Sequence, residues 1–195
     1  MALGLARDLG EIDLVLMLDS LVRHPDFHPG ELTELPTRLR GLTRLRRLLG
    51  HADPRSESPW ESILRLFHDV VEAPVESQYE VIQEGRFVAR GDFRLAGLRV
   101  LHEYDGDIHL TVEQQRRDLA RARRLDAAGW IRRGYTSYDL TRDPDGLLRD
   151  IDASLGRRRN PLHLRRWRDL LQGSCLTSTG RVTLARRLSP LPVVT

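Results

Sequence analysis

The sequence predicts an α/β protein in which a mixed β-sheet is flanked by helices and preceded by a helical segment. Three observations support this class. The hydrophobic period is helical over residues 1–50 and 58–71, strand-like between residues 77 and 104, and helical again from residue 111. Turns rich in Gly and Pro separate these stretches. The predicted order is a set of helices followed by α-β-β-β-α-β-α.

The N-terminal segment, residues 1–55, is predicted to contain three helices. Apolar residues recur at helical spacing over residues 12–22, and His24-Pro25-Asp26 interrupts that pattern. A second helix is expected to begin near Pro29. A third is expected over residues 42–49, where leucines follow the same period.

The next helix has a well-defined start. Ser58 is a suitable N-cap, Pro59 suits the first helical position, and Glu61 completes a capping box. A broad apolar face continues to Val71, and Pro74 ends the helix. The capping box by itself is a sufficient explanation for Glu61.

Three strands are predicted next. Residues 77–81 and 87–90 flank a turn at residues 83–86, and a third strand is expected over residues 99–104. Ala96-Gly97 is predicted as a two-residue hairpin turn before that third strand. We therefore expect an antiparallel hairpin around this turn.

This hairpin collects three carboxylates. With a two-residue turn, Asp92 lies opposite Leu101 and is the diagonal neighbour of Glu103, about 7–8 Å away at the backbone. Because side chains alternate along a strand, Asp92, Glu103 and Asp105 are predicted to share one face. A buried acid requires a partner, and carboxylate oxygens suit Mg²⁺ or Mn²⁺. Surface turn acids and structural ion pairs are the alternative interpretation.

The remaining elements are an arginine-rich helix over residues 111–128 that ends at Gly129, a fourth strand over residues 130–136, and a last helix over residues 139–155. Two charges and a glycine at Arg132-Arg133-Gly134 are unfavourable in a central strand. The sequence therefore places a weak point in the fourth strand.

All 31 basic residues are arginine, so no lysine is available for catalysis. The charge is uneven, because residues 156–195 hold nine Arg and one Asp. Such a basic segment suits DNA, RNA or a membrane surface. We expect three parts: a helical segment (1–55), a central domain (56–155) and a basic C-terminal extension (156–195).

Composition excludes several classes of protein. Hydrophobic content of 40% and charged content of 30% are ordinary for a globular domain. No apolar run is long enough to span a bilayer, and the first residues lack the layout of a signal peptide. The single cysteine, Cys175, suits a reducing compartment. We expect a cytoplasmic protein; the sequence carries no signal for its oligomeric state.

Several motifs occur in a fixed order along residues 56–152. They are Ser56-Glu57-Ser58-Pro59-Trp60-Glu61-Ser62, Gly85-Arg86-Phe87-Val88-Ala89-Arg90-x-Asp92-Phe93, Glu103-Tyr104-Asp105-Gly106-x-x-His109, Arg117-Asp118 and Ala127-Ala128-Gly129-Trp130. Together they resemble a bacterial endonuclease-like domain of unknown function. That domain is similar to very-short-patch-repair endonucleases and belongs with the PD-(D/E)XK nucleases.

The resemblance implies a restriction-endonuclease-like core with a metal site on the hairpin. Asp92 and Glu103 match the two metal-binding acids, and Glu61 matches a helix acid that often joins the metal. Asp105 stands where the wider superfamily usually has lysine. In the whole chain no lysine exists to replace it.

The implied activity is metal-dependent DNA cleavage. A metal held by Asp92 and Glu103 polarises the scissile phosphate and acidifies a bound water. His109 is the candidate proton acceptor, because imidazole titrates near neutral pH. Nearby arginines are assigned the role of stabilising the negative charge of the phosphate. These are Arg116, Arg117 and Arg121.

Two alternatives remain open. One is a catalytically silent nucleic-acid-binding or toxin–antitoxin-type interaction module on the same fold, which the missing lysine favours. The other is an RNA-processing enzyme that uses the same acids. The arginines of residues 116–124 suit either a nucleic-acid contact or a solvated helix face.

Overall fold

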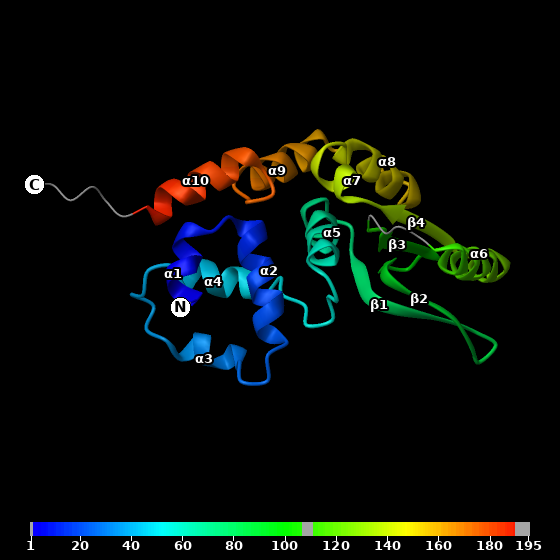
Figure 1. Ribbon diagram of the computed structural model, residues 1–195, viewed down its shortest axis with the longest axis horizontal. Helices are drawn as coiled ribbons and strands as arrows, with labels where there is room; N and C mark the ends of the chain where they lie inside the picture. The colour runs from blue at the N-terminus through cyan, green and yellow to red at the C-terminus, as the bar shows by residue number, and fades with distance from the viewer. Residues whose placement is uncertain (1, 107–110, 190–195) are drawn as a thin grey trace, which may run out of the picture. The chain divides into compact units, whose positions relative to one another are not determined.

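The computed structural model describes residues 2–106 and 111–189 (Figure 1). The chain forms two compact units. One unit combines Met1–Pro54 with Arg165–Thr195, and the other comprises Arg55–Leu164. Among the described residues, no helix has the length and the hydropathy needed to cross a lipid bilayer.

The first unit is helical. Its core contains fully buried leucines at Leu14, Leu18 and Leu45. The three helices that the sequence predicts are confirmed, and a short helix precedes them. The unit's elements are α1 (Ala2–Asp8), α2 (Glu11–Val22), α3 (Pro29–Glu34), α4 (Leu42–Leu49), the end of α9 (Pro161–Gln172) and α10 (Ser178–Leu188).

Hydrogen bonds join the C-terminal helices to the N-terminal ones within this unit. The Asp13 carboxylate accepts from the Ser174 hydroxyl at 2.8 Å and from the backbone N–H of Cys175 at 3.0 Å. Arg187 donates to the carbonyl of Asp8 at 2.8 Å. Residues 165–189 therefore pack as part of a helical unit, and not as a separate extension.

The second unit contains the mixed sheet. Strands β1, β2 and β3 are antiparallel neighbours, and β4 pairs in parallel with β3. Helix α6 makes the crossover that a parallel pair requires. The elements are α5 (Pro59–Val70), β1 (Val75–Gln83), β2 (Arg86–Leu95), β3 (Val100–Tyr104), α6 (Val112–Ala127), β4 (Ile131–Tyr135), α7 (Ser137–Thr141) and α8 (Pro144–Ser154).

Local signals place two of the helix starts. Ser58 caps α5, because its hydroxyl accepts from the N–H of Glu61 at 3.2 Å, and Pro59 occupies the first turn.

The prediction of one helix over residues 139–155 is wrong. The segment divides into α7 and α8, since Pro144 lacks an N–H and begins a new helix.

The predicted pairing of β2 with β3 is also wrong, by two residues. Arg94 lies opposite Leu101, where the sequence had placed Asp92. The turn itself forms, because the N–H of Leu98 donates to the carbonyl of Leu95 at 3.0 Å. However, β3 begins two residues after Leu98, so the connection contains four residues and the pairing shifts.

Helices cover both faces of the sheet (Figure 1). On one face, α6 contributes Leu125 to a buried cluster with Val81, Ala89 and Leu101. On the other face, α5 packs against β3, and the His68 ring lies 6.0 Å from the Phe93 ring between their centroids. The predicted class, a mixed sheet flanked by helices, is confirmed.

Two buried histidines lie on the α5 face. The ring nitrogens Nε2 of His68 and Nδ1 of His102 are 2.8 Å apart, and Nδ1 of His68 lies 2.7 Å from the carbonyl of Leu64. Because that carbonyl only accepts, neutral His68 carries its proton on Nδ1, and His102 donates to His68. Burial lowers the pKa of His68 to about 4 and that of His102 to about 2.

This pair predicts acid sensitivity. The unfolded imidazoles take up protons near their usual pKa of 6.5, whereas the folded ones do so only at lower pH. The free energy of unfolding is therefore expected to fall below about pH 6.5, by at most about 1.4 kcal/mol per pH unit for each histidine. Urea denaturation between about pH 7 and 4 measures this slope.

A double variant, His68→Leu with His102→Phe, is expected to flatten the slope. His24→Asn is the matched control, because His24 is 61% exposed and should leave the slope unchanged. An equal slope in the double variant and the wild type contradicts the prediction.

Candidate acidic site on the central hairpin

The regular alternation of side chains is interrupted at Asp92. A Cβ atom built on Gly91 lies 3.1 Å from Oε1 of Glu103, on the α6 side of the sheet. Phe93 instead faces His68 on the α5 side. In a regular strand these two positions face the same way. Asp92 therefore lies where β2 changes face.

The neighbouring strands show the same irregularity. Gln78 of β1 has a positive φ of 53° and lies between two regular pairs with β2. On the other side, the β2–β3 pairs end at Phe93. Oδ2 of Asp92 then accepts from the N–H of Tyr104 at 2.8 Å, in place of a backbone carbonyl. The Asp92 carboxylate thus lies beside the point where β2 and β3 separate.

Glu61 reaches the same place from α5. Its Oε2 accepts from the N–H of Glu57 and from the amide of Gln78, both at 2.9 Å. Burial, together with the charges of Glu61 and Glu103, raises the pKa of Asp92 to about 6 against the opposing effect of the Tyr104 hydrogen bond. Carboxylates from α5, β2 and β3 therefore interact with one another.

Glu103 is buried, with 7% of its side chain exposed, and two guanidiniums bind it. Nη1 and Nη2 of Arg121 donate to its two carboxylate oxygens, the first at 2.8 Å. Nε of Arg132 donates to Oε2 of Glu103 at 2.6 Å, and Nη2 of Arg132 donates to Asp105. Burial opposes ionisation of Glu103, but the hydrogen bonds and charges of the two arginines hold its pKa below the usual value.

The resulting group, which we call the acid–arginine cluster, holds four carboxylates and two guanidiniums. Its members are Glu61, Asp92, Glu103, Asp105, Arg121 and Arg132. When all six side chains are ionised, the four carboxylates and two guanidiniums carry a net charge of −2. No three His, Cys, Asp or Glu residues within 2–106 and 111–189 are grouped so as to hold a metal by themselves.

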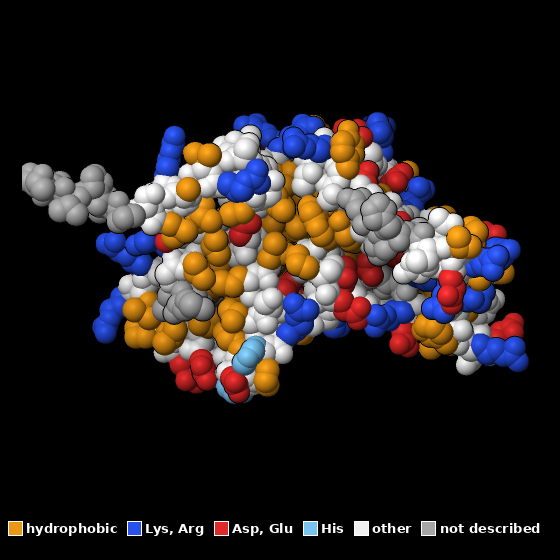
Figure 2. All heavy atoms as spheres, in the orientation of Figure 1, with side chains coloured by type: hydrophobic (Ala, Val, Ile, Leu, Met, Phe, Trp, Pro, Cys, Tyr) orange, Lys and Arg blue, Asp and Glu red, His pale blue; other side chains and the backbone are white. Residues whose placement is uncertain are grey.

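The predicted site residues have different outcomes. Of the three predicted arginines, Arg121 enters the cluster. Arg117 pairs with Glu113 one helical turn away on the exposed surface, and Arg116 is exposed. His109 lies outside the described residues. Around α6, Figure 2 shows acidic and basic side chains next to one another, so this face is not uniformly basic.

Sequence reasoning missed two members of this environment. Arg132 was predicted to weaken a central strand, but β4 is the last strand in the sheet order and Arg132 binds Glu103 and Asp105. Gly134 provides space, since a Cβ there lies 1.7 Å from Oδ2 of Asp105. Alternation along the fourth strand, which puts positions 132 and 134 on one face, was the available signal.

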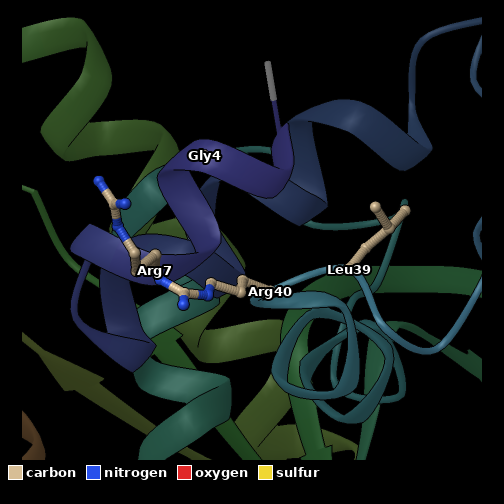
Figure 3. A pocket seen from close by; sticks show the side chains of 4 residues that line it. All are labelled: Gly4, Arg7, Leu39 and Arg40. Carbon is tan, nitrogen blue, oxygen red and sulfur yellow. The ribbon is translucent and has the colours of Figure 1, made fainter.

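A small pocket in the helical unit is a weaker candidate. Its volume is about 230 Å³, and it is lined by Gly4, Arg7, Leu39 and Arg40 (Figure 3). The guanidinium of Arg7 donates to both carboxylate oxygens of Asp8. This lining supplies no acid, base or nucleophile, so the acid–arginine cluster remains the leading candidate.

The fold and the cluster define an α/β protein with a buried carboxylate–arginine site. The chain is similar to uncharacterized proteins of two Mycobacterium tuberculosis strains, CDC 1551 / Oshkosh and H37Rv, with 33% identity over 122 residues. The match covers 62% of this chain, which spans about half (45%) of the length of these relatives. No protein-family profile and no solved structure match it.

The space provided by Gly134 can be tested with a double-mutant cycle. Gly134→Ala is expected to lower the free energy of unfolding by about 1 kcal/mol, because Asp105 must rotate away from Arg132. In an Asp105→Ala background the same change is expected to cost almost nothing. Thermal denaturation of the four proteins gives the coupling, and purely additive losses contradict this role of Gly134.

Asp92 predicts a pH-dependent stability. Its folded pKa of about 6 exceeds its usual 3.8, so the unfolding free energy falls as pH rises between these values. Without metal, Asp92→Asn is expected to raise that free energy near neutral pH by about 1–3 kcal/mol, and the gain disappears below about pH 4. Denaturation in EDTA measures this, with the exposed Glu80→Gln as control. A gain that is independent of pH contradicts the prediction.

Proposed function

We propose that the Arg55–Leu164 unit is a metal-dependent nuclease that hydrolyses phosphodiester bonds, with DNA as the preferred substrate. One observation carries the proposal. The buried carboxylate of Asp92 lies beside the point where β2 and β3 separate, and the charges of Glu61 and Glu103 act on it, within an α-β-β-β-α-β order. That order and these acids are what the resemblance to a restriction-endonuclease-like core implies.

The donor set fits Mg²⁺ or Mn²⁺. Mg²⁺ is usually held by one or two carboxylates together with waters and substrate phosphates, so it does not require three protein ligands. Asp92 and Glu103 would hold the ion, with Glu61 beside them, and two added positive charges would balance the cluster. When bound, such an ion polarises the phosphate and acidifies a water.

The protein's own residues have separate tasks in this proposal. Asp92 is ionised above about pH 6 and then offers Oδ1, which accepts no hydrogen bond from the described residues. Arg121 fixes the orientation of Glu103 through two hydrogen bonds. Gln78 orients Glu61 through one hydrogen bond. RNA is the second candidate substrate, since the same acids suit either phosphodiester.

A different observation favours a second function. Glu103 is already neutralised by Arg121 and Arg132, as in a structural ion-pair network. A catalytically silent nucleic-acid-binding or toxin–antitoxin-type interaction module would keep such a network without using a metal.

Cleavage of supercoiled plasmid separates these functions. With Mg²⁺ or Mn²⁺, the wild type is expected to nick the plasmid. Asp92→Asn and Glu103→Gln are expected to lower the rate by at least about 100-fold, because each removes a charged oxygen ligand. Gel electrophoresis over time measures the rate, and loss of cleavage on adding EDTA is the second expected result.

Glu113→Gln is the matched control, since Glu113 is 73% exposed and pairs only with Arg117 among the described residues. It should cleave like the wild type. If the wild type binds DNA but cuts at no metal concentration, and binding survives both acid substitutions, the silent module replaces the nuclease.

A further inference from the structure

The two guanidiniums of the acid–arginine cluster are bound differently. Arg121 uses both terminal nitrogens on Glu103, and its Nη2 also donates to the carbonyl of Arg90 at 2.6 Å. Arg132 uses Nε and Nη2 on its two acids. Its Nη1 donates to no acceptor within the described ranges. Its side chain is 32% exposed, against 24% for Arg121.

Two acids fix the position of the Arg132 guanidinium. Nε of Arg132 donates to Glu103 of β3, and its Nη2 donates to Asp105, which follows the end of β3 directly, so two acids orient one planar group. Gly134 leaves the space in which Asp105 lies, since any Cβ there would overlap Oδ2 of Asp105. The free edge of the guanidinium is thereby held rigidly, with little rotamer entropy left to lose on binding.

We propose that Arg132 binds the substrate phosphate through Nη1, and that Asp105 is its positioning residue. This inference rests on the proposed nuclease function. A cation at this place serves the chemistry in which phosphate charge increases, and the chain has no lysine to supply it. The cation comes from β4, whereas Asp105, the residue directly after β3, orients it.

A phosphate-binding Arg132 and a purely structural Arg132 lead to different expected results. A structural Arg132 affects stability alone. A phosphate-binding Arg132 also contributes to the salt dependence of DNA binding, by about 0.9 in the slope of log K against log salt. Arg121, with both terminal nitrogens engaged, is expected to act through Glu103.

The experiment compares the wild type with Arg132→Ala, Arg132→Lys and Arg142→Ala, using one short DNA duplex. Arg142 is the matched control, because it is exposed and lies outside the cluster. Single-turnover cleavage is measured in Mg²⁺. Affinity is measured by fluorescence anisotropy at several salt concentrations in Ca²⁺, and circular dichroism verifies folding.

We expect Arg132→Ala to cleave about 100-fold more slowly and to reduce the salt slope by about one, while Arg142→Ala changes neither. Arg132→Lys is expected to keep the slope but to cleave at least about tenfold more slowly, since a flexible ammonium lacks the planar fork that Glu103 and Asp105 hold in one orientation. If the alanine variant does not fold, the lysine variant decides, and a wild-type rate overturns the proposal.

The outcomes separate this inference from the nuclease function. If the wild type cleaves and Arg132→Ala cleaves as fast with an unchanged slope, Arg132 is structural and the nuclease stands. If the wild type does not cleave, the nuclease function fails. The salt slope then decides whether Arg132 contacts phosphate, and an unchanged slope, or no binding at all, overturns the contact.

Discussion

The buried carboxylate of Glu103 is the constraint on which the sheet unit depends. An ionised acid with 7% of its side chain exposed is tolerated only with partners, and these come from α6 and from β4. Arg121 and Arg132 thereby join the crossover helix and the last strand of the sheet order to β3. Removing either guanidinium would leave part of a buried charge uncompensated, which costs more than the pair itself contributes.

A second constraint is the change of face at Asp92. The positive φ of Gln78 and the hydrogen bond from the Tyr104 N–H to Asp92 belong to the same irregularity. Without it, alternation would continue through β2 and Phe93 would leave the His68 side of the sheet. The irregularity places an acid between two helix-covered faces, where Glu61 from α5 and Glu103 from β3 both interact with it.

These two constraints give the cluster its character. Arginine neutralises one acid completely, while Asp92 keeps a raised pKa and an oxygen that accepts no hydrogen bond from the described residues. The nuclease proposal relies on Asp92, whose negative charge no arginine of the described residues neutralises. The silent-module alternative relies on Glu103, whose charge the two arginines neutralise. The mycobacterial relatives, which are uncharacterized, leave both as proposals. Their similarity covers 62% of this chain.

Local signals in the sequence were enough for the order of the elements from α5 to β4, for the start of α5 at Ser58-Pro59, and for the gathering of acids on one hairpin. These depend on capping, turn chemistry and hydrophobic period, which act over a few residues. The register of β2 with β3 was predicted wrongly, because a four-residue connection and a two-residue turn share the same Ala96-Gly97 signal. Only the tertiary structure decided that Arg132 faces Glu103 and that Gly134 makes room for Asp105. The pairing of β3 with β4, whose partners lie 31 positions apart, determines those contacts, and alternation along β4 does not by itself identify the partner strand.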